Sequence, residues 1–394
     1  MDLQALATWG QLKGLTLMGT GDFTHPLWQK ELSLMLEPAE QGLFALRESY
    51  QKSVDAVVYP SCAGLQRFLL TAEISTIFRR NGRCYKIHSI IFAPSLQVVA
   101  KISRVLAAIG NIVYDGRPML SLDVKDLVKI VLDASPDCLI VPAHIWTPHF
   151  GLLGSKSGFD SFNDCFQELT EYIYAFEKGL SSNFLMNGMV SQLDRYAILC
   201  NSDAHSVHNL GREANVFSTD LSYAGVVSTI KNNDRSQLIA GIEFFPEMGK
   251  YYGSGHRACN VYKTIEQVII DPMCAACNKP VTIGVASRVA ALADRTIEQA
   301  VACMRPRYAI APLQEIIAYC LQVQSSIKKV QQLYHHLLGH LGNEFYILLD
   351  AHASDIEKVS MPSIAQAIVA MRQGNVRVTP GYDGVYGSLI FDNV

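Results

Sequence analysis

The sequence has 394 residues, of which 49% are hydrophobic and 18% charged, and its formal net charge at pH 7 is −3. This composition is typical of an ordered globular protein and excludes a disordered chain. The slightly acidic balance excludes a strong general attraction to nucleic acid, so a nucleic-acid contact would need a local basic patch or groove. The sequence shows no membrane-length apolar run and no signal-peptide pattern, which predicts a cytoplasmic protein without a membrane contact.

Apolar strand-like runs alternate with amphipathic helices over residues 1–245. Asp2 is the expected N-cap of a first helix that ends near Gly14, and Gly110 ends an amphipathic helix at 95–109. Strands that alternate with helices predict a parallel, barrel-like α/β domain. Further helices are expected at 123–134 and 221–231, and strands at 15–20, 67–73, 85–92, 138–142, 172–177, 197–200 and 238–245.

Acidic and histidine side chains follow the ends of these predicted strands. The run at 197–200 leads into Asp203 and His205, which share one face of an extended segment and offer an oxygen and a nitrogen ligand to a metal ion. In parallel barrels the catalytic groups gather at the carboxyl ends of the strands. A metal site is therefore favoured over helix caps and solvated loops. The residues at strand ends are Asp22, Glu73, His144, Glu177, Asp203 and His205, and His88 lies inside its predicted strand.

Several segments also carry a family resemblance. The most specific are GTGDFTHP at 19–26, PAHIWTP at 142–148, GSKSGFD at 154–160 and NSDAH at 201–205. Shorter matches at 211–215, 255–257, 292–295 and 380–384 extend the resemblance along the chain. By these segments the chain resembles the endonuclease Q family, which belongs to the PHP (polymerase and histidinol phosphatase) superfamily of metal-dependent phosphoesterases.

The resemblance implies a distorted (β/α)7 barrel of the PHP type that holds two or three divalent metal ions, namely zinc, manganese or magnesium. It also implies a hydrolase that cuts DNA on the 5′ side of a deaminated base (uracil, hypoxanthine or xanthine) or at an abasic site. Closely spaced divalent ions suit this reaction because they activate water and stabilise both oxygens of the displacement. Carried over by motif, the ligands are Asp22, Glu73, His88, His144, Asp203 and His205, with Asp22, Asp203 and His205 assigned to catalysis. For His25, a ligand role and a structural role are equally open.

The sequence departs from the family pattern at its start. Family members begin with a strand that ends in a His-x-His pair, which supplies two further ligands, whereas no such pair precedes Asp2. The barrel region 1–245 is therefore expected to lack its first strand. Either the start codon is assigned too late or this version lacks two ligands. The first explanation is favoured because the later strands keep their site residues.

Residues 246–300 interrupt the alternation and contain three cysteines with metal-ligand spacing. Cys274 and Cys277 form a Cys-x-x-Cys pair, and Cys259 lies 15 residues upstream. Three thiolates at this spacing predict a structural zinc-binding module, with His256 as the candidate fourth ligand. The sequence leaves the role of His256 open. A module with so small a core would depend on its metal ion to fold.

Residues 301–394 are expected to form a helical C-terminal region with a glycine- and tyrosine-rich end. An enzyme that acts on a damaged base must extract it from the stack, and Tyr382, Asp383 and Tyr386 are candidates for the receiving pocket. Phosphate contacts are expected from a local basic groove. The alternative role for its arginines is that of buried structural partners of carboxylates. The members of this groove are Lys156 and Arg212, followed by Arg195, Arg257, Arg288 and Arg295.

Three functions compete. The first is a metal-dependent repair endonuclease that binds lesion-containing DNA, with a sliding clamp as a candidate protein partner. The second is a PHP-type phosphoesterase for a small phosphorylated metabolite, and the third is an inactive homologue that lost its activity with the first strand. The regions beyond residue 245 favour the first, because a metabolite pocket needs neither a zinc module nor a helical domain.

Overall fold

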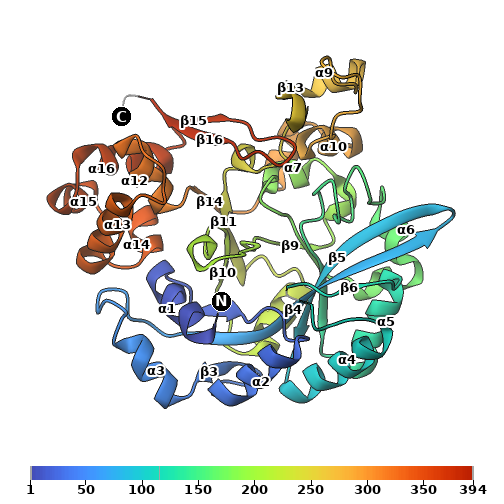
Figure 1. The fold of residues 1–394 in the computed structure, drawn as a ribbon, viewed down its shortest axis with the longest axis horizontal. Helices are drawn as coiled ribbons and strands as arrows, with labels where there is room; N and C mark the ends of the chain where they lie inside the picture. The colour runs from blue at the N-terminus through green and yellow to red at the C-terminus, as the bar shows by residue number, and fades with distance from the viewer. Residues whose placement is uncertain (1, 115, 393–394) are drawn as a thin grey trace.

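A long antiparallel hairpin organises the main sheet. The computed structural model describes residues 2–114 and 116–392, and in it β4 (Arg67–Arg80) pairs along its length with β5 (Arg83–Ala93) (Figure 1). Asn81 and Gly82 join the two strands with φ angles of 50° and 78°, as in the tight turns of hairpins. The sheet has the order β2-β3-β4-β5-β7, and β1 and β6 also pair with β4. The shorter strands are β1 (Leu17–Gly19), β2 (Leu36–Pro38), β3 (Phe44–Leu46), β6 (Met119–Leu120) and β7 (Leu139–Pro142).

Two smaller sheets continue beyond β7. The parallel strands β8 (Ala175–Glu177) and β9 (Ala197–Leu199) form the first. The next has the order β10-β11-β14 and contains β10 (Ala214–Phe217), β11 (Leu238–Phe244) and β14 (Arg307–Ile310). β14 is parallel to β11, so a segment beyond residue 300 adds a strand to a sheet of the first half.

The structure confirms a mixed α/β fold but not a wholly parallel sheet. β4 is antiparallel to β5, and β5 is antiparallel to β7. The expectation that a strand ends at Glu73 is wrong, because β4 continues to Arg80. The residues from Ile74 to Thr76 are buried and pair with β5, so the strand continues through the interior of the sheet although Ser75 and Thr76 are polar. Among the described residues, strand pairing does not close into a complete barrel.

The predicted helices of the first half are confirmed, and so is the expected N-cap Asp2. The Asp2 carboxylate accepts a hydrogen bond from the Ala5 N–H, and Gly14 ends α1 with a φ angle of 90°. Ser95 and Asp123 cap α4 and α5 in the same way. No helix in the described part of the chain is long and apolar enough to cross a membrane. The helices are α1 (Leu3–Lys13), α2 (Pro26–Met35), α3 (Glu48–Asp55), α4 (Leu96–Ile109), α5 (Val124–Ala134), α6 (Phe162–Phe166), α7 (Phe184–Gly188) and α8 (Tyr223–Lys231), with the 3-10 turns η1 (Gln167–Tyr172), η2 (Ser191–Leu193) and η3 (Val207–Asn209).

Residues 246–300 contain a small unit with its own core. Val268, Cys274 and Val281 are buried against one another, apart from the main core. The antiparallel strands β12 (Ser254–His256) and β13 (Val261–Lys263) lie at its base. Its other elements are η4 (Pro246–Met248), η5 (Arg257–Cys259), α9 (Ile265–Ile270), α10 (Val285–Leu292) and α11 (Ile297–Ala302).

The C-terminal region is helical as predicted, but it ends in a hairpin. β15 (Val376–Thr379) and β16 (Ser388–Phe391) extend from the helices toward the unit at 246–300 (Figure 1). The Gly381 N–H donates to Glu247 O, and the Gly253 N–H donates to Gly381 O, so the turn of the hairpin is bound to that unit. The helices are α12 (Leu313–Leu321), α13 (Lys328–Leu341), α14 (Glu344–Leu349), α15 (Ala353–Val359) and α16 (Pro362–Arg372).

One buried carboxylate connects the first helix to the C-terminal helices. Lys13 Nζ lies 2.5 Å from Glu344 Oε2, and the two side chains are only 2% and 4% exposed. The Tyr334 hydroxyl donates to the same oxygen, and the Leu313 N–H donates to Glu344 Oε1. Burying an ion pair is costly unless its hydrogen-bonding groups are satisfied, and here both carboxylate oxygens have partners.

Replacing Lys13 with Met should lower the free energy of unfolding by about 3–5 kcal/mol, because Glu344 would remain as a buried charge without its counter-ion. Chemical denaturation followed by circular dichroism measures this loss. The matched control is Lys52→Met, which breaks an exposed pair with Glu48 on α3 and should leave the stability almost unchanged. Equal effects of the two substitutions would contradict the role assigned to the buried pair.

Candidate active site

Glu73, His88 and His144 meet at one point beside the main sheet. Glu73 pairs with Ile90 and His88 with Ser75, which places Glu73 and His88 diagonally on one face of the β4–β5 hairpin. Glu73 Oε1 lies 2.8 Å from His88 Nδ1 and 3.3 Å from His144 Nε2. One oxygen and two nitrogens within 4.8 Å of one another provide three ligand atoms for a metal ion.

His88 and His144 contact each other as well as the carboxylate of Glu73. His88 Nδ1 and His144 Nε2 are 3.0 Å apart, and the tautomers of the two rings decide whether they bond to each other or both donate to Glu73. Burial lowers the pKa of His88 to about 4 against the attraction of Glu73. Burial also acts to lower the pKa of His144, but the hydrogen bond to Glu73 and the negative charges of Glu73, Glu177 and Asp203 together outweigh it and raise this pKa to about 9. Burial acts to raise the pKa of Glu73, yet hydrogen bonds from His144 and His88 hold it well below its usual value, so this carboxyl is ionised.

Glu177 supports His144 from the other side. Its Oε2 accepts a hydrogen bond from the backbone N–H of His144 at 2.8 Å, while Glu177 Oε1 and His144 Nδ1 are buried without a partner among the residues that the structure describes. Burial raises the pKa of Glu177 to about 7. Unpaired buried polar atoms are rare and often mark the place of an ion or a water molecule. Together with the oxygen and nitrogen donors of the cluster, they fit a divalent cation. The sequence marks Glu177 as a strand-end acid but does not assign it to the site.

Asp22, His144 and Asp203 have an unusual backbone conformation in common. Their φ angles are 46°, 29° and 45°, in the left-handed region that side chains other than glycine rarely adopt. Such conformations cost about 1–3 kcal/mol each and concentrate at functional sites. Each of the three residues comes shortly after a strand, respectively β1, β7 and β9, which confirms their predicted strand-end positions.

Two side chains, one just before β10 and one within it, hold the turn that carries Asp203. The buried Arg212 donates to Ser202 O at 2.8 Å and to Asp203 O at 3.1 Å. The Asn215 amide bonds both the N–H and the carbonyl of Cys200 at the end of β9. These contacts indicate that Arg212 has a structural role and does not bind phosphate, because its guanidinium is bonded to the protein itself.

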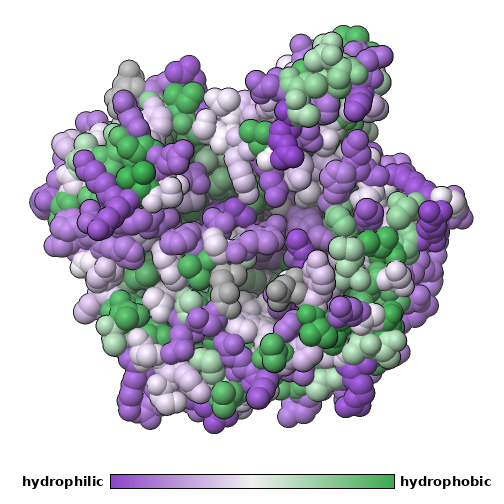
Figure 2. Space-filling model, viewed as in Figure 1, coloured by the Kyte–Doolittle hydropathy of each residue, from purple (hydrophilic) through white to green (hydrophobic). Residues whose placement is uncertain are grey.

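A cavity of about 1240 Å³ lies over the cluster. Figure 2 shows a hollow near the centre of one face of the molecule, with mostly hydrophilic side chains around it. His205 is the most exposed of the predicted ligands, with 66% of its side chain accessible, and its Nδ1 lies 3.8 Å from Asp203 Oδ1. Within the described residues, the lining of the cavity does not include His144, which contacts Glu73 at 3.3 Å. The charged and imidazole groups that line the cavity are Asp22, His25, Glu73, His88, Arg117, Glu177, Asp203, His205, Glu213 and Asp220.

Arg117 is a site residue that the sequence does not reveal. It lies in the turn before β6, and its Nη1 is 2.9 and 3.1 Å from the two oxygens of Glu73. The same nitrogen is 3.8 Å from Asp203 Oδ1. β6 has only two residues, so no strand pattern marks this turn as part of a strand end. The one available signal is an arginine between Gly116 and Pro118, which is weak by itself.

Two other predicted groove residues are engaged in ion pairs. Arg288 pairs with Asp160 at 2.5 Å and also donates to two backbone carbonyls. Arg295 pairs with Asp194. These contacts agree with the structural alternative.

Lys156 is exposed and, like Asp383 in the turn of the C-terminal hairpin, acts on the pKa of His149. Burial lowers the pKa of His149, the Lys156 and Lys86 charges lower it further, and Asp383 opposes them, so these groups share one region.

The predicted base pocket is not assembled beside the metal-ligand cluster. The Tyr382 hydroxyl donates to Asn260 Oδ1 at 2.7 Å, and its ring packs edge-on against Tyr262. Asp383 accepts a hydrogen bond from the Arg257 N–H at 2.7 Å, and the Tyr386 side chain is exposed. Within the described residues, the lining of the cavity does not include Tyr382, Asp383 or Tyr386. Their role toward a base stays a prediction.

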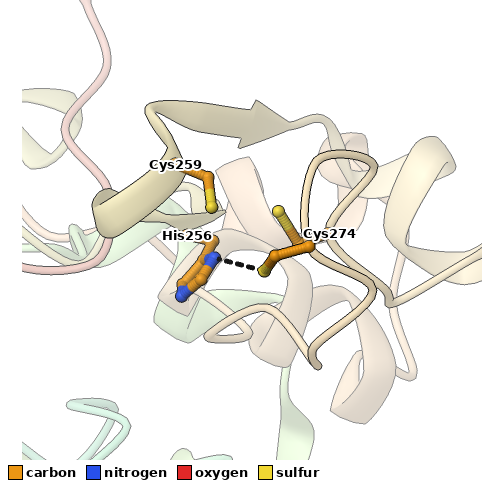
Figure 3. Close-up of side chains that lie close together, drawn as sticks. His256, Cys259 and Cys274 are labelled. Carbon is orange, nitrogen blue, oxygen red and sulfur yellow. Dashed lines mark hydrogen bonds between the residues drawn. The ribbon is translucent and has the colours of Figure 1, made fainter.

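A second candidate metal site lies in the unit at 246–300. His256, Cys259, Cys274 and Cys277 place their ligand atoms within 4.8 Å of one another, and Figure 3 shows His256, Cys259 and Cys274 facing a common space. Cys277 Sγ is 3.3 Å from His256 Nδ1. Burial acts to raise the pKa of the Cys274 thiol, but hydrogen bonds from backbone N–H groups and His256 lower it to about 6. The structure therefore brings His256, whose role the sequence left open, to the three cysteines.

Comparison with solved structures gives two full-length matches. The lesion-specific endonuclease PfuEndoQ from Pyrococcus furiosus superposes with a TM-score of 0.81 and 28% identity, covering 100% of this chain and 91% of that protein. Endonuclease Q in complex with a 27-mer duplex substrate bearing an abasic lesion at the active site superposes with a TM-score of 0.83, again with 28% identity, covering 100% of this chain and 92% of that one. The fold is thus that of a lesion-specific DNA endonuclease.

Comparison with sequences gives two relatives and one domain. Residues 312–375, which include α12 to α16, match the domain described as MJ0043 C-terminal domain. Uncharacterized protein MJ0043 of Methanocaldococcus jannaschii is 31% identical over 72% of this chain, which spans 35% of that relative. Uncharacterized protein YqxK of Bacillus subtilis is 32% identical over 77% of this chain and 73% of its own length. The chain therefore belongs to the family of Bacillus subtilis YqxK.

Proposed function

We propose that the protein is a divalent-metal-dependent endonuclease of DNA repair, built on a PHP-type barrel, that cuts the phosphodiester on the 5′ side of a deaminated base or at an abasic site. The observation that carries this proposal is the full-length likeness to endonuclease Q with an abasic duplex at its active site. The convergence of carboxylates and imidazoles on one cavity supports it.

The residues of the cluster fit the tasks of phosphodiester hydrolysis. Divalent ions, when bound, supply an activated water molecule and stabilise the charge that develops on the phosphate. Glu73, His88 and His144 would hold such ions from the rigid side of the cavity, and Asp22 and Asp203 from the turns after β1 and β9. Glu177 fixes the backbone of His144 and so orients a ligand without needing to be one.

Incubation with lesion-containing DNA tests the proposal. Duplexes that carry one uracil, hypoxanthine, xanthine or abasic site are treated with the protein and Mn²⁺, Zn²⁺ or Mg²⁺, and the products are separated on denaturing gels. A nick immediately 5′ of the lesion supports the proposal. Phosphate release from small phosphorylated metabolites alone would support the phosphoesterase alternative, and a lack of both activities the inactive homologue. The upstream His-x-His strand and a sliding-clamp contact stay predictions, and the codons before Met1 in the gene test the first.

Asp203→Asn should reduce the nicking rate by at least about a thousandfold, because it removes the charge of a metal ligand while keeping its shape. Single-turnover kinetics on the best lesion substrate measure the effect. The matched control is Asp355→Asn, the same chemical change at a half-exposed surface ion pair with Lys358 on α15, which should retain full activity. An active Asp203→Asn enzyme would exclude this residue from the reaction.

We also propose that His256, Cys259, Cys274 and Cys277 bind one structural zinc ion. Cys274→Ser should release one zinc per chain and expose residues 250–285 to proteolysis, since the local core is too small to fold without its metal. Metal analysis and limited proteolysis measure these changes. Cys84→Ser alters an exposed, isolated thiol and should keep the metal content of the wild type. Retention of that zinc by Cys274→Ser would contradict the assignment.

A further inference from the structure

Arg117 places a fixed positive charge inside the candidate metal centre. Its side chain is 29% exposed and contacts Glu73 on β4 and Asp203 after β9, two groups that belong to different sheets. Asp22 belongs to the same group of charges, since burial, Glu73 and Arg117 together influence its pKa. The guanidinium therefore compensates carboxylates that would otherwise repel one another in a half-buried space.

The oxygens of Glu73 leave little room for a further partner. Oε1 accepts from His88 and from Arg117, and His144 Nε2 is also within 3.3 Å. Oε2 lies 3.1 Å from Arg117. A divalent ion would need these lone pairs at a distance of about 2.0–2.2 Å. A guanidinium at hydrogen-bonding distance from the same oxygens competes for the lone pairs and repels the ion.

We propose that Arg117 is a built-in counter-ion that a divalent cation must displace from Glu73 and Asp203, and that it sets the affinity of the centre for its metal ion. This inference rests on the proposed function, because it assumes that the centre binds divalent cations. Because the Arg117 guanidinium competes with every divalent ion for the same oxygens, it lowers the affinity of the centre for each of them by a similar factor. Ions that bind O and N ligands weakly, such as Mg²⁺, are excluded first, and Mn²⁺ or Zn²⁺ remain bound.

The geometry of the turn allows the guanidinium to leave. Arg117 follows Gly116, which has a φ angle of 83°, and its side chain lines the cavity instead of being enclosed in the core. Its contacts with Glu73 and Asp203 are made by the end of a long side chain. A change of rotamer moves the charge away from the carboxylates without moving the hairpin that carries Glu73.

Isothermal titration of the zinc-loaded, full-length protein with Mn²⁺ and Mg²⁺, without DNA, tests the proposal. Arg117→Gln should bind Mn²⁺ at least about tenfold more tightly than the wild type, because one positive charge near the site has been removed. Arg117→Lys keeps the charge and should remain close to the wild type. The control is Arg67→Gln. Arg67 lies on β4, as Glu73 does, but it pairs with Glu40 outside the cluster, so its loss should leave the Mn²⁺ affinity unchanged.

The outcomes separate this inference from the proposed function. If the wild type binds no divalent ion in the cavity, the metal-dependent function fails. If it binds Mn²⁺ and Arg117→Gln binds with the same or lower affinity, only the role of Arg117 fails. Thermal unfolding gives a second measurement that does not use activity. Without metal, Arg117→Gln should melt below the wild type because the carboxylates repel one another, and saturating Mn²⁺ should raise its Tm by more than that of the wild type.

Discussion

The ionised carboxylate of Glu73, surrounded by nitrogen donors, is the interaction on which the centre depends. Its position follows from the β4–β5 hairpin, which sets Glu73 and His88 on one face at a fixed spacing. A ligand in the middle of a paired strand is held more precisely than one on a loop. Asp22, His144 and Asp203 lie around Glu73 on turns with left-handed backbone conformations. The strain at Asp22, His144 and Asp203 is thus concentrated where side chains must converge on the hairpin.

The segment 211–215 connects the turn of Asp203 to the end of β8. Arg212 holds the turn of Asp203 through its carbonyls. Glu213 accepts from the fully buried Lys178, the residue that follows Glu177, with Nζ and Oε1 2.5 Å apart. The two residues just before β10 therefore tie the turn after β9 to the end of β8. A change in Arg212 or Glu213 would displace the groups around a metal ion without touching the ion itself, as outer residues of metal sites do.

The sequence predicted the helices and the clustering of Glu73, His88 and His144 better than the pairing of the strands. Caps and apolar periodicity identified α1, α4 and α5, because these signals are local. The position of Glu73 was misjudged because an acid after an apolar run resembles a strand end, and only pairing with β5 shows that β4 continues. Arg117 was missed for the same reason, since its importance arises from contacts with residues 44 and 86 positions away in the chain. The three cysteines of the candidate zinc site could be identified from the sequence because they lie close together along the chain, whereas the role of His256 became apparent only in the structure.

The accessory regions are attached to the metal-binding half in a way that bears on the size of the substrate. The Lys13–Glu344 pair fixes the C-terminal helices against α1, and Phe345 at the start of α14 contributes to the wall of the cavity. The C-terminal hairpin reaches from these helices to the unit at 246–300 and bonds to it through Gly381. Figure 1 shows the helices and this unit standing on two sides of the sheets, with the hairpin between them. A small metabolite would be enclosed by the cavity alone and would gain nothing from these fixed flanks. A polymer that extends beyond its reacting phosphate would contact them, which is why their rigid attachment supports DNA as the substrate.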